Sequence, residues 1–231
     1  MLNGKLMQTD QSLREAVVAQ VKGCGILPCI KLKRPADYLA YAQAMYDGGA
    51  RVIEVTLTSP GALQAIEAIS NEFKGRLWVA SGTTLDAASA LEVIRHGGAC
   101  LVNPAVIPEV IDVAKRNGVA VFSGAFTPTE VLAAMRAGAD MVKIFPGQLG
   151  GPGYMTNLKM VYPQADLIPS GGVSLENAPE FIRAGACAVS GARTFMNHEM
   201  IEKEGLGWIT QHVRRFIEVI RQARKNLPEL P

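Results

Sequence analysis

The chain has 231 residues, and its composition excludes several classes of protein. Hydrophobic residues make up 48% and charged residues 19%, which excludes a disordered chain. No apolar run approaches the roughly 20 residues of a membrane span, so no membrane partner is expected. The net charge of +2 provides no strong field for nucleic acid, and we expect no nucleic-acid partner.

The N-terminus and the cysteines indicate a compartment. Residues 1–10 lack the continuous apolar core of a secretory signal. The four cysteines, Cys24, Cys29, Cys100 and Cys187, form no C-x-x-C pair. Buried free thiols in a reducing environment are the expected state, so we predict a cytoplasmic protein.

A repeated junction organises the chain after a first predicted helix at about residues 11–22. In this junction a helix ends at a glycine or asparagine, and a small residue and an apolar strand follow. It occurs at residues 48–50, 97–99, 117–119, 137–139 and 184–186. Five junctions of one chemistry imply a repeated strand–helix architecture.

The apolar patterns predict eight strands alternating with helices. The strands are predicted at residues 26–31, 51–57, 77–81, 99–102, 120–123, 141–145, 165–169 and 187–190. The helices between and after them are predicted at residues 35–46, 61–73, 86–96, 108–116, 129–137, 175–184 and 206–225. This order favours an α/β fold, a (β/α)8 TIM barrel with an extra N-terminal helix.

An open doubly wound sheet is the alternative fold. Against it, no G-x-G-x-x-G follows a strand, and the units are evenly sized. No linker divides the chain, so residues 1–231 are expected to form a single barrel domain, with the N-terminal helix within 1–24 and the C-terminal helix over 206–225.

A lysine interrupts the apolar strand predicted near the middle of the chain, where a cation is costly. Because side chains alternate along a strand, Lys143 shares a face with Met141 and Phe145. Burial favours a neutral amine, which can attack a carbonyl. A structural ion pair is the alternative for Lys143.

A carboxylate interrupts a second apolar strand in the same way. Alternation places Val52, Glu54 and Thr56 on one face, which we expect to line the barrel interior. Glu54 and Lys143 then share one poorly solvated space. A purely structural pair remains possible, but buried ion pairs are weak stabilising devices, so the two residues indicate a catalytic site.

An inward lysine and carboxylate suit Schiff-base catalysis. The amine attacks a ketone, loss of water gives an iminium, and that cation accepts electrons as the neighbouring C–C bond breaks. The carboxylate transfers the protons. No cofactor or metal is needed, and His96, His198 and His212 fall away from the strand ends, where we expect them to be surface residues.

Two small-residue turns predict a phosphate site. Residues 169–174, Pro-Ser-Gly-Gly-Val-Ser, read as a strand end, paired glycines and a serine that caps a helix. The turn at Ser190, Gly191 and Ala192 follows the last strand, and barrels often bind phosphate between the loops after strands seven and eight. Ordinary tight turns are the alternative.

Other loops after strands carry weaker signals. Thr83, after strand three, offers a hydroxyl, and Pro104, after strand four, could shape a pocket wall, although both could be turn residues. The glycine-rich residues 148–154 are expected to form a loop over the site. Thr127 and Glu130 form the pattern of a helix capping box.

Four motifs together resemble the class I aldolases that cleave 2-keto-3-deoxy-6-phosphogluconate and 4-hydroxy-2-oxoglutarate. They lie at residues 49–57, 81–83, 142–146 and 170–174, in that family's order and approximate spacing. The resemblance implies a (β/α)8 barrel, a homotrimer, and a small-molecule keto acid substrate.

The resemblance also implies site roles. Lys143 would form the Schiff base and Glu54 would be the general acid/base. Thr83 would bind the carboxylate at the pyruvate end, and Phe145 and Pro104 would line the pocket. The distal end would be bound by Ser170, Gly171, Gly172, Gly191 and Ala192.

Three positions depart from the family pattern. Thr58 stands where the family usually has an arginine, so we count Thr58 as the substrate-binding candidate there, and Lys31 or Lys33 could supply the missing charge. Gln148 replaces a glutamate, and Ala192 replaces a serine of the last phosphate turn. These changes put the substrate in question.

The leading functional hypothesis is an aldehyde-lyase that cleaves 2-dehydro-3-deoxy-6-phosphogluconate to pyruvate and glyceraldehyde 3-phosphate. A 4-hydroxy-2-oxoglutarate or related keto-deoxy acid aldolase is the alternative within this class. The alternatives from other classes are a phosphosugar isomerase or epimerase, with Glu54 as base and Lys143 as an electrostatic clamp, and a non-catalytic binding barrel.

Overall fold

The computed structural model describes the backbone of residues 3–225 and the side chains of residues 13–225. Residues 1, 2 and 226–231, which the single-domain expectation also covers, lie outside this range. In the described part of the chain, no helix is long and apolar enough to cross a membrane.

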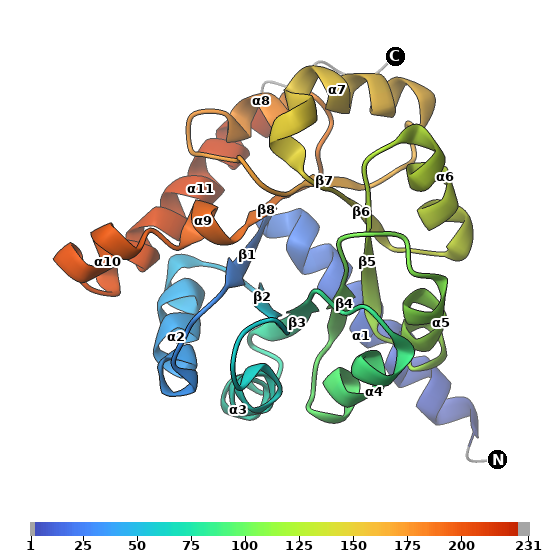
Figure 1. Cartoon of the computed structure of the whole chain (residues 1–231), viewed down its shortest axis with the longest axis horizontal. Coiled ribbons are helices and arrows are strands. Elements are labelled where there is room, and N and C mark those ends of the chain that lie inside the picture. The colour runs from blue at the N-terminus through green and yellow to red at the C-terminus, as the bar shows by residue number, and fades with distance from the viewer. Residues whose placement is uncertain (1–2, 226–231) are drawn as a thin grey trace.

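Eight parallel strands form the centre of the molecule (Figure 1). They are β1 (Ile26–Ile30), β2 (Val52–Thr56), β3 (Trp78–Gly82), β4 (Cys100–Val102), β5 (Ala120–Ala125), β6 (Met141–Ile144), β7 (Leu167–Pro169) and β8 (Val189–Gly191). Their order is β7-β6-β5-β4-β3-β2-β1-β8, and bridges from Leu167 to Ala186 and from Ser170 to Ser190 join the two ends. The sheet therefore closes into the predicted (β/α)8 barrel.

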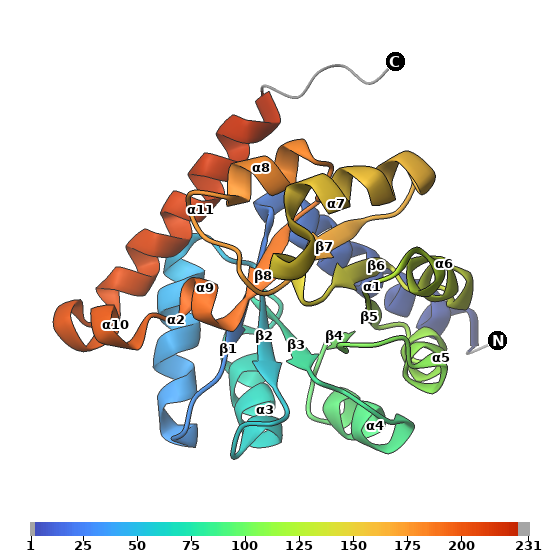
Figure 2. The ribbon, with the colours of Figure 1, turned by 45° about the horizontal axis from the view of Figure 1, so that its top comes forward.

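Helices surround the barrel between successive strands (Figure 2). They are η1 (Pro35–Asp37), α2 (Tyr38–Gly48), α3 (Ala62–Phe73), α4 (Ala87–Arg95), α5 (Pro108–Arg116), α6 (Pro128–Ala137), α7 (Gly147–Val161) and α8 (Ala178–Arg183). After β8 come α9 (Ala192–Phe195), α10 (His198–Glu204) and α11 (Gly207–Lys225), and α1 (Asn3–Cys24) precedes β1. The short helices α9 and α10 were not predicted.

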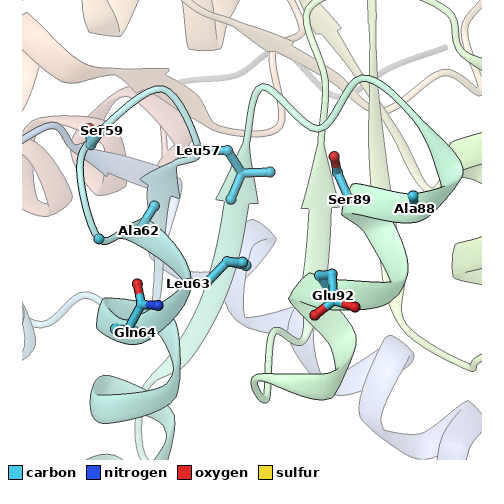
Figure 3. Close-up of a pocket in the computed structure, with 9 residues that line it drawn as sticks. Leu57, Ser59, Ala62, Leu63, Gln64, Ala88, Ser89 and Glu92 are labelled. Atoms are coloured by element: carbon cyan, nitrogen blue, oxygen red, sulfur yellow. The ribbon is translucent and has the colours of Figure 1, made fainter.

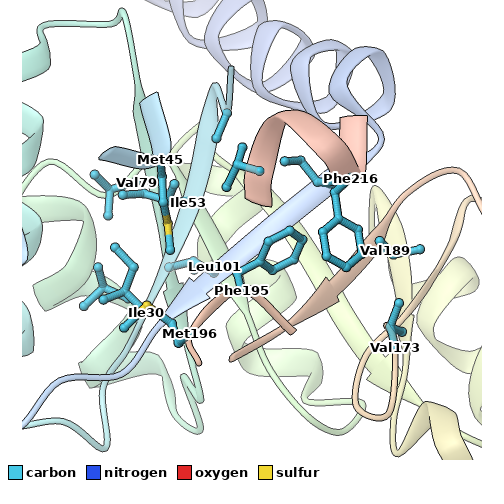
Figure 4. Packing of buried hydrophobic residues seen from close by; sticks show 14 of the residues in the cluster. Ile30, Met45, Ile53, Val79, Leu101, Val173, Val189, Phe195, Met196 and Phe216 are labelled. Atoms are coloured by element: carbon cyan, nitrogen blue, oxygen red, sulfur yellow. The ribbon is translucent and has the colours of Figure 1, made fainter. Parts of the chain in front are cut away.

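Alternation along each strand divides the buried residues into two layers. Val52 and Met141 belong to an inner cluster, and Ile53 and Val142 to an outer cluster between the strands and helices. The outer layer continues to α9 and α11, where Phe195 of α9 and Phe216 of α11 lie with ring centroids 4.7 Å apart (Figure 4). The predicted inward and outward faces of β2 and β6 are therefore confirmed.

The N-terminal helix covers one end of the barrel. Val17 and Val21 of α1 pack with Leu27, Val52 and other inner residues. Since the strands are parallel, the loops after their carboxyl ends lie at the opposite end. That end remains available for a binding site.

Two local predictions are wrong. Residues 148–154 lie in α7 rather than in a loop, because Gly151, with φ 65° and ψ −173°, kinks the segment and Pro152 begins its second helical part. Helix α8 begins at Ala178 rather than near Leu175, with Asn177 as its N-cap. Ser174 therefore does not cap the helix directly.

Candidate active site

Lys143 and Glu54 face each other inside the barrel. Lys143 Nζ lies 3.5 Å from both Oε1 and Oε2 of Glu54. The lysine side chain is 11% exposed and the glutamate side chain 3%. Because charge-assisted N–H···O bonds are usually about 2.7–2.9 Å long, this contact is loose for an ion pair. The amine and the carboxylate have capacity for a further partner between them.

The neighbouring strands make room for the Glu54 side chain. Glu54 is aligned with Cys29 of β1 and with Ala80 of β3. A Cβ atom placed on Gly82 would lie 2.1 Å from Glu54 Oε1. Any side chain at position 82 would therefore displace the carboxylate.

Two thiols share the barrel interior with this pair. Burial raises the pKa of Cys29 well above its usual value, and the charge of Glu54 raises it further. Burial likewise raises the pKa of Cys100 well above its usual value. Both thiols are protonated at neutral pH, so neither is poised as a nucleophile.

Three threonine hydroxyls lie in a row at the mouth of the barrel. Thr56 Oγ1 is 3.1 Å from Thr58 Oγ1 and 3.2 Å from Thr83 Oγ1. Thr83 has φ 61°, an uncommon left-handed conformation for a residue with a side chain. The structure thus brings the predicted residues Thr58 and Thr83 together through Thr56, which lies one alternation step beyond Glu54.

Pro104 lies beside β5, the strand that pairs with the lysine strand β6. Gly124 is aligned with Lys143, and a Cβ on Gly124 would lie 2.0 Å from the carbonyl carbon of Pro104. The missing side chain at position 124 therefore lets the Pro104 loop approach β5 closely. Phe145 follows Lys143 by two residues and is 43% exposed, so its ring remains accessible at the carboxyl end of the strands.

The turns after β7 and β8 meet. Gly171 and Gly172 have φ of 89° and 71°, and Ser170 forms a bridge with Ser190. A Cβ on Gly191 would lie 3.8 Å from the amide nitrogen of Gly171. Ala192 is half-buried at the start of α9, next to this pair of turns.

Helix α7 packs onto the paired glycines. A Cβ on Gly171 would lie 2.6 Å from Gln148 Oε1, and one on Gly172 would lie 2.3 Å from Gln148 Cβ. Asn177 Nδ2 donates to the carbonyl of Gly172 at 2.9 Å. Both glycines are therefore required by conformation and by space.

A pocket of about 820 Å³ opens beside the threonine row. Lys31, Lys33, Arg34 and Thr58 contribute to its lining, and His198 of α10 lies on another side. The cations proposed to compensate for Thr58 thus lie in the same pocket as Thr58.

A second pocket, of about 480 Å³, lies between α3 and α4 on the outer ring (Figure 3). Leu57, Leu63, Ser89 and Glu92 help to line it, and neither Lys143 nor Glu54 does. We assign it no part in the site.

The histidines lie outside the barrel interior. His198 is exposed, as predicted. The surface prediction is wrong for His96 and His212, which are half-buried. His96 contacts the carbonyl of Glu92, and His212 stacks on Trp208 and contacts the carbonyl of Thr194. Burial lowers the pKa of His212. Over residues 13–225, no group of three or more His, Cys, Asp or Glu side chains is placed to hold a metal ion.

Sequence reasoning missed several residues that shape the site. The alternation that identified Glu54 could also have placed Cys29 on an inward face, because Cys29 occupies the corresponding position in β1. No sequence signal showed that Gly82 and Gly124 are close to Glu54 and to the Pro104 loop, because those contacts join different strands.

A barrel that holds a buried amine and a carboxylate, with glycine turns after its last two strands, defines a class of enzymes that act on small carbonyl compounds. Comparison with known proteins narrows that class. Residues 17–212 match the family model described as KDPG and KHG aldolase. The chain belongs to this family, and the protein is an aldehyde-lyase.

Individual relatives cover most of the chain. It is 32% identical over 202 residues to the 2-dehydro-3-deoxy-6-phosphogalactonate aldolase of Escherichia coli K12, covering 85% of this chain and 96% of that protein. It is 27% identical over 226 residues to the 2-dehydro-3-deoxy-phosphogluconate aldolase of Pseudomonas aeruginosa, covering 97% and 99%.

A solved structure is similar over a comparable range. The KDPG aldolase of Legionella pneumophila, crystallised with pyruvate captured at low pH as a covalent carbinolamine intermediate, matches with a TM-score of 0.79 and 25% identity. The match covers 85% of this chain and 96% of that chain.

Proposed function

We propose that the protein cleaves a 2-keto-3-deoxy sugar-acid phosphate by retro-aldol chemistry through a Schiff base on Lys143. The observation that carries this proposal is the buried Lys143–Glu54 pair, with its amine and carboxylate 3.5 Å apart. The carbinolamine captured in the Legionella relative supports covalent catalysis in this family.

The steps follow from the two groups. The amine of Lys143 attacks the substrate ketone, and a proton from Glu54 leaves with the carbinolamine hydroxyl as water, which gives an iminium and the Glu54 carboxylate. The Glu54 carboxylate removes the proton from the C4 hydroxyl, the C3–C4 bond breaks, and the electron pair moves toward the iminium to form an enamine. An aldehyde leaves. Glu54 then returns the proton to C3, and hydrolysis releases pyruvate and the free lysine.

The substrate we favour is 2-dehydro-3-deoxy-6-phosphogluconate, which would give pyruvate and glyceraldehyde 3-phosphate. The turns at Gly171–Gly172 and Gly191–Ala192 supply a site for the distal phosphate, and Thr83 with Thr58 supplies hydroxyls for the carboxylate. The relatives include aldolases named for both the gluconate and the galactonate compounds. 4-Hydroxy-2-oxoglutarate remains the alternative substrate within this chemistry.

Borohydride trapping tests the mechanism. We expect the wild-type protein incubated with pyruvate and borohydride to gain one reduced adduct, which peptide mass mapping places on Lys143. Lys143→Met should lose both the adduct and turnover. Glu54→Gln should still form the adduct but cleave substrate at least about 100-fold more slowly, because general acid–base catalysis typically contributes about 10²–10⁴-fold. Turnover by the wild type without a trappable imine would favour an isomerase or epimerase instead.

A substrate panel then tests the phosphate site. Gluconate and galactonate isomers of the keto-deoxy acid, with and without phosphate, and 4-hydroxy-2-oxoglutarate are assayed for pyruvate release. We expect the phosphorylated compounds to have higher kcat/KM. Equal values with and without phosphate would remove the glycine turns from substrate recognition.

We also propose that the protein is a cytoplasmic homotrimer that acts alone on its small-molecule substrate, as the family resemblance implies. Sedimentation equilibrium of the purified protein measures the assembly. A mass about three times the 24.7 kDa of the chain is expected.

A further inference from the structure

We propose that Cys29 is a positioning residue for Glu54, and that its thiol donates a hydrogen bond that orients the buried carboxylate. This inference rests on the proposed role of Glu54 in proton transfer. It concerns a residue that neither the sequence motifs nor the Schiff-base chemistry includes.

The barrel register places the thiol beside the carboxylate. Cys29 of β1 is aligned with Glu54 of β2, and the two strands are adjacent. Cys29 is 7% exposed and Glu54 is 3% exposed. The flanking Ile30 and Ile53 belong to the outer cluster, so alternation turns both Cys29 and Glu54 toward the interior.

The Glu54 carboxylate needs another donor. An ionised carboxylate accepts up to about four hydrogen bonds, and a buried one is costly unless it is paired and hydrogen-bonded. Lys143 contacts both oxygens of Glu54, but at the long distance of 3.5 Å. On the β3 side stands Gly82, which has no side chain to donate. Cys29, on the β1 side, has one.

The thiol carries the proton that this role requires. Burial raises the pKa of Cys29 well above its usual value, and the charge of Glu54 raises it as well, while the charges of Lys143 and Lys31 act in the opposite direction. The S–H group is therefore present at neutral pH. The ionisable side chains that act on Cys29 or on Glu54 include Cys100 of β4, Lys143 of β6 and Lys31, whose charge acts on Cys29 from just beyond β1.

Such a bond has two effects on catalysis. It holds one carboxylate oxygen toward β1, so that the other oxygen is directed to the substrate near Lys143. It also favours the ionised carboxylate, which is the form that removes the C4 proton. Loss of the bond should slow proton transfer and restrict it to higher pH.

Exchange of the pyruvate methyl protons tests this role without requiring the natural substrate. In deuterated buffer, enamine formation and reprotonation exchange these protons, and NMR measures the rate as a function of pD. Cys29→Val should exchange about five-fold more slowly than wild type, the effect of losing one hydrogen bond of typical net strength. Its acid limb should lie at higher pD. Cys29→Ser, which restores a donor, should recover the rate and the profile.

Cys100→Val is the matched control. Cys100 is also a buried inward thiol, but it is aligned with Ala80 rather than Glu54, and its Sγ lies 3.8 Å from the carbonyl of Leu101. It should exchange protons like wild type. A Cys29→Val protein with the wild-type rate and profile would overturn the proposal, as would an equal loss in Cys100→Val.

Borohydride trapping with pyruvate separates this proposal from the proposed function. All variants should still form the Lys143 adduct, because none removes the amine. If wild type neither traps pyruvate nor exchanges its protons, the Schiff-base function fails. If wild type does both and Cys29→Val is unchanged, the role of Cys29 alone fails. Cys29→Ala, compared with Cys29→Ser, provides the same comparison if the valine variant does not fold.

Discussion

At the scale of single residues, the site depends on what is missing as much as on what is present. In the proposed mechanism Glu54 and Lys143 provide the reactive groups, while Gly82 leaves space for Glu54 and Gly124 lets the Pro104 loop approach β5. A buried side chain keeps one orientation only if its surroundings exclude the others. The absence of a Cβ at position 82 is therefore as necessary to the Glu54 geometry as the carboxylate is to the chemistry.

Gly82→Ala should impair activity more than stability. The new Cβ would lie 2.1 Å from Glu54 Oε1 and 2.9 Å from Cδ, so the carboxylate must move. We expect kcat for aldol cleavage to fall about 100-fold, as displacements near 1 Å can cause, and the free energy of unfolding to fall by about 1–3 kcal/mol from overpacking. Steady-state kinetics and urea denaturation measure these effects.

Gly153→Ala serves as the control for that substitution. A Cβ on Gly153 would meet no atom within 4 Å, and the residue is exposed in α7. This variant should keep wild-type activity and be equally or slightly more stable, because alanine favours a helix. Full activity in Gly82→Ala would show that Glu54 tolerates a different position.

At the scale of elements, periodicity predicted the strands and helices well, while glycine-rich segments misled. The predicted helix at residues 108–116 coincides with α5, Pro108–Arg116, because its apolar residues recur at helical spacing and Pro108 starts it. Residues 148–154 were expected to be a loop, since three glycines in seven residues disfavour a helix. Packing of α7 against the barrel outweighs that local preference.

The candidate site, like the helices and strands, could be predicted from the sequence where periodicity decides and not where packing between elements decides. Alternation identified Glu54 and Lys143 as inward residues because each interrupts an apolar strand. Contacts between strands, such as Cys29 with Glu54 or Gly124 with Pro104, depend on register and closure. One sequence without its register does not contain them.

The capping box of α6 gives a pH-dependent prediction. Glu130 Oε2 accepts from the amides of Thr127 at 2.7 Å and Phe126 at 2.9 Å, and these bonds lower the pKa of Glu130. Its folded-state pKa thus lies below the unfolded value of about 4.3, so the stabilisation is full above that value and disappears as the pH falls through the folded value.

Glu130→Gln should therefore lower the free energy of unfolding by about 0.5–1 kcal/mol at pH 7 and by less near pH 3. Urea denaturation at both pH values measures the difference. Glu109→Gln is the control, since Glu109 occupies the first turn of α5, whose N-cap Ile107 makes no side-chain cap bond. A destabilisation by Glu130→Gln that is equal at both pH values would contradict the assigned role.

At the scale of the whole molecule, closure of the barrel assembles the mouth from distant segments. Strand β1 lies between β2 and β8, so the loop after Ile30 reaches both the threonine row and the turns after the last strands. The net charge of only +2 provides little general attraction for an anionic substrate. We therefore expect recognition of a substrate carboxylate to depend on local cations at the mouth, where Lys31, Lys33 and Arg34 line one pocket with Thr58.

Of these cations, Lys31 is the one we expect to replace the charge of the family arginine. It is the first residue after β1, two residues beyond Cys29, and its positive charge acts on the Cys29 thiol. Arg34 is engaged by Asp37 at 2.9 Å. Hydrogen bonds to charged groups are worth about 1.5–3 kcal/mol, so Lys31→Ala should lower kcat/KM for the keto acid at least about tenfold, mainly through KM.

Two further variants serve as controls. Lys31→Arg should retain most of the activity, and Lys33→Ala, the matched control from the same loop, should change kcat/KM less than about two-fold. A larger effect from Lys33→Ala would transfer the role to Lys33, and no effect from either variant would mean that the threonine hydroxyls bind the carboxylate without a lysine.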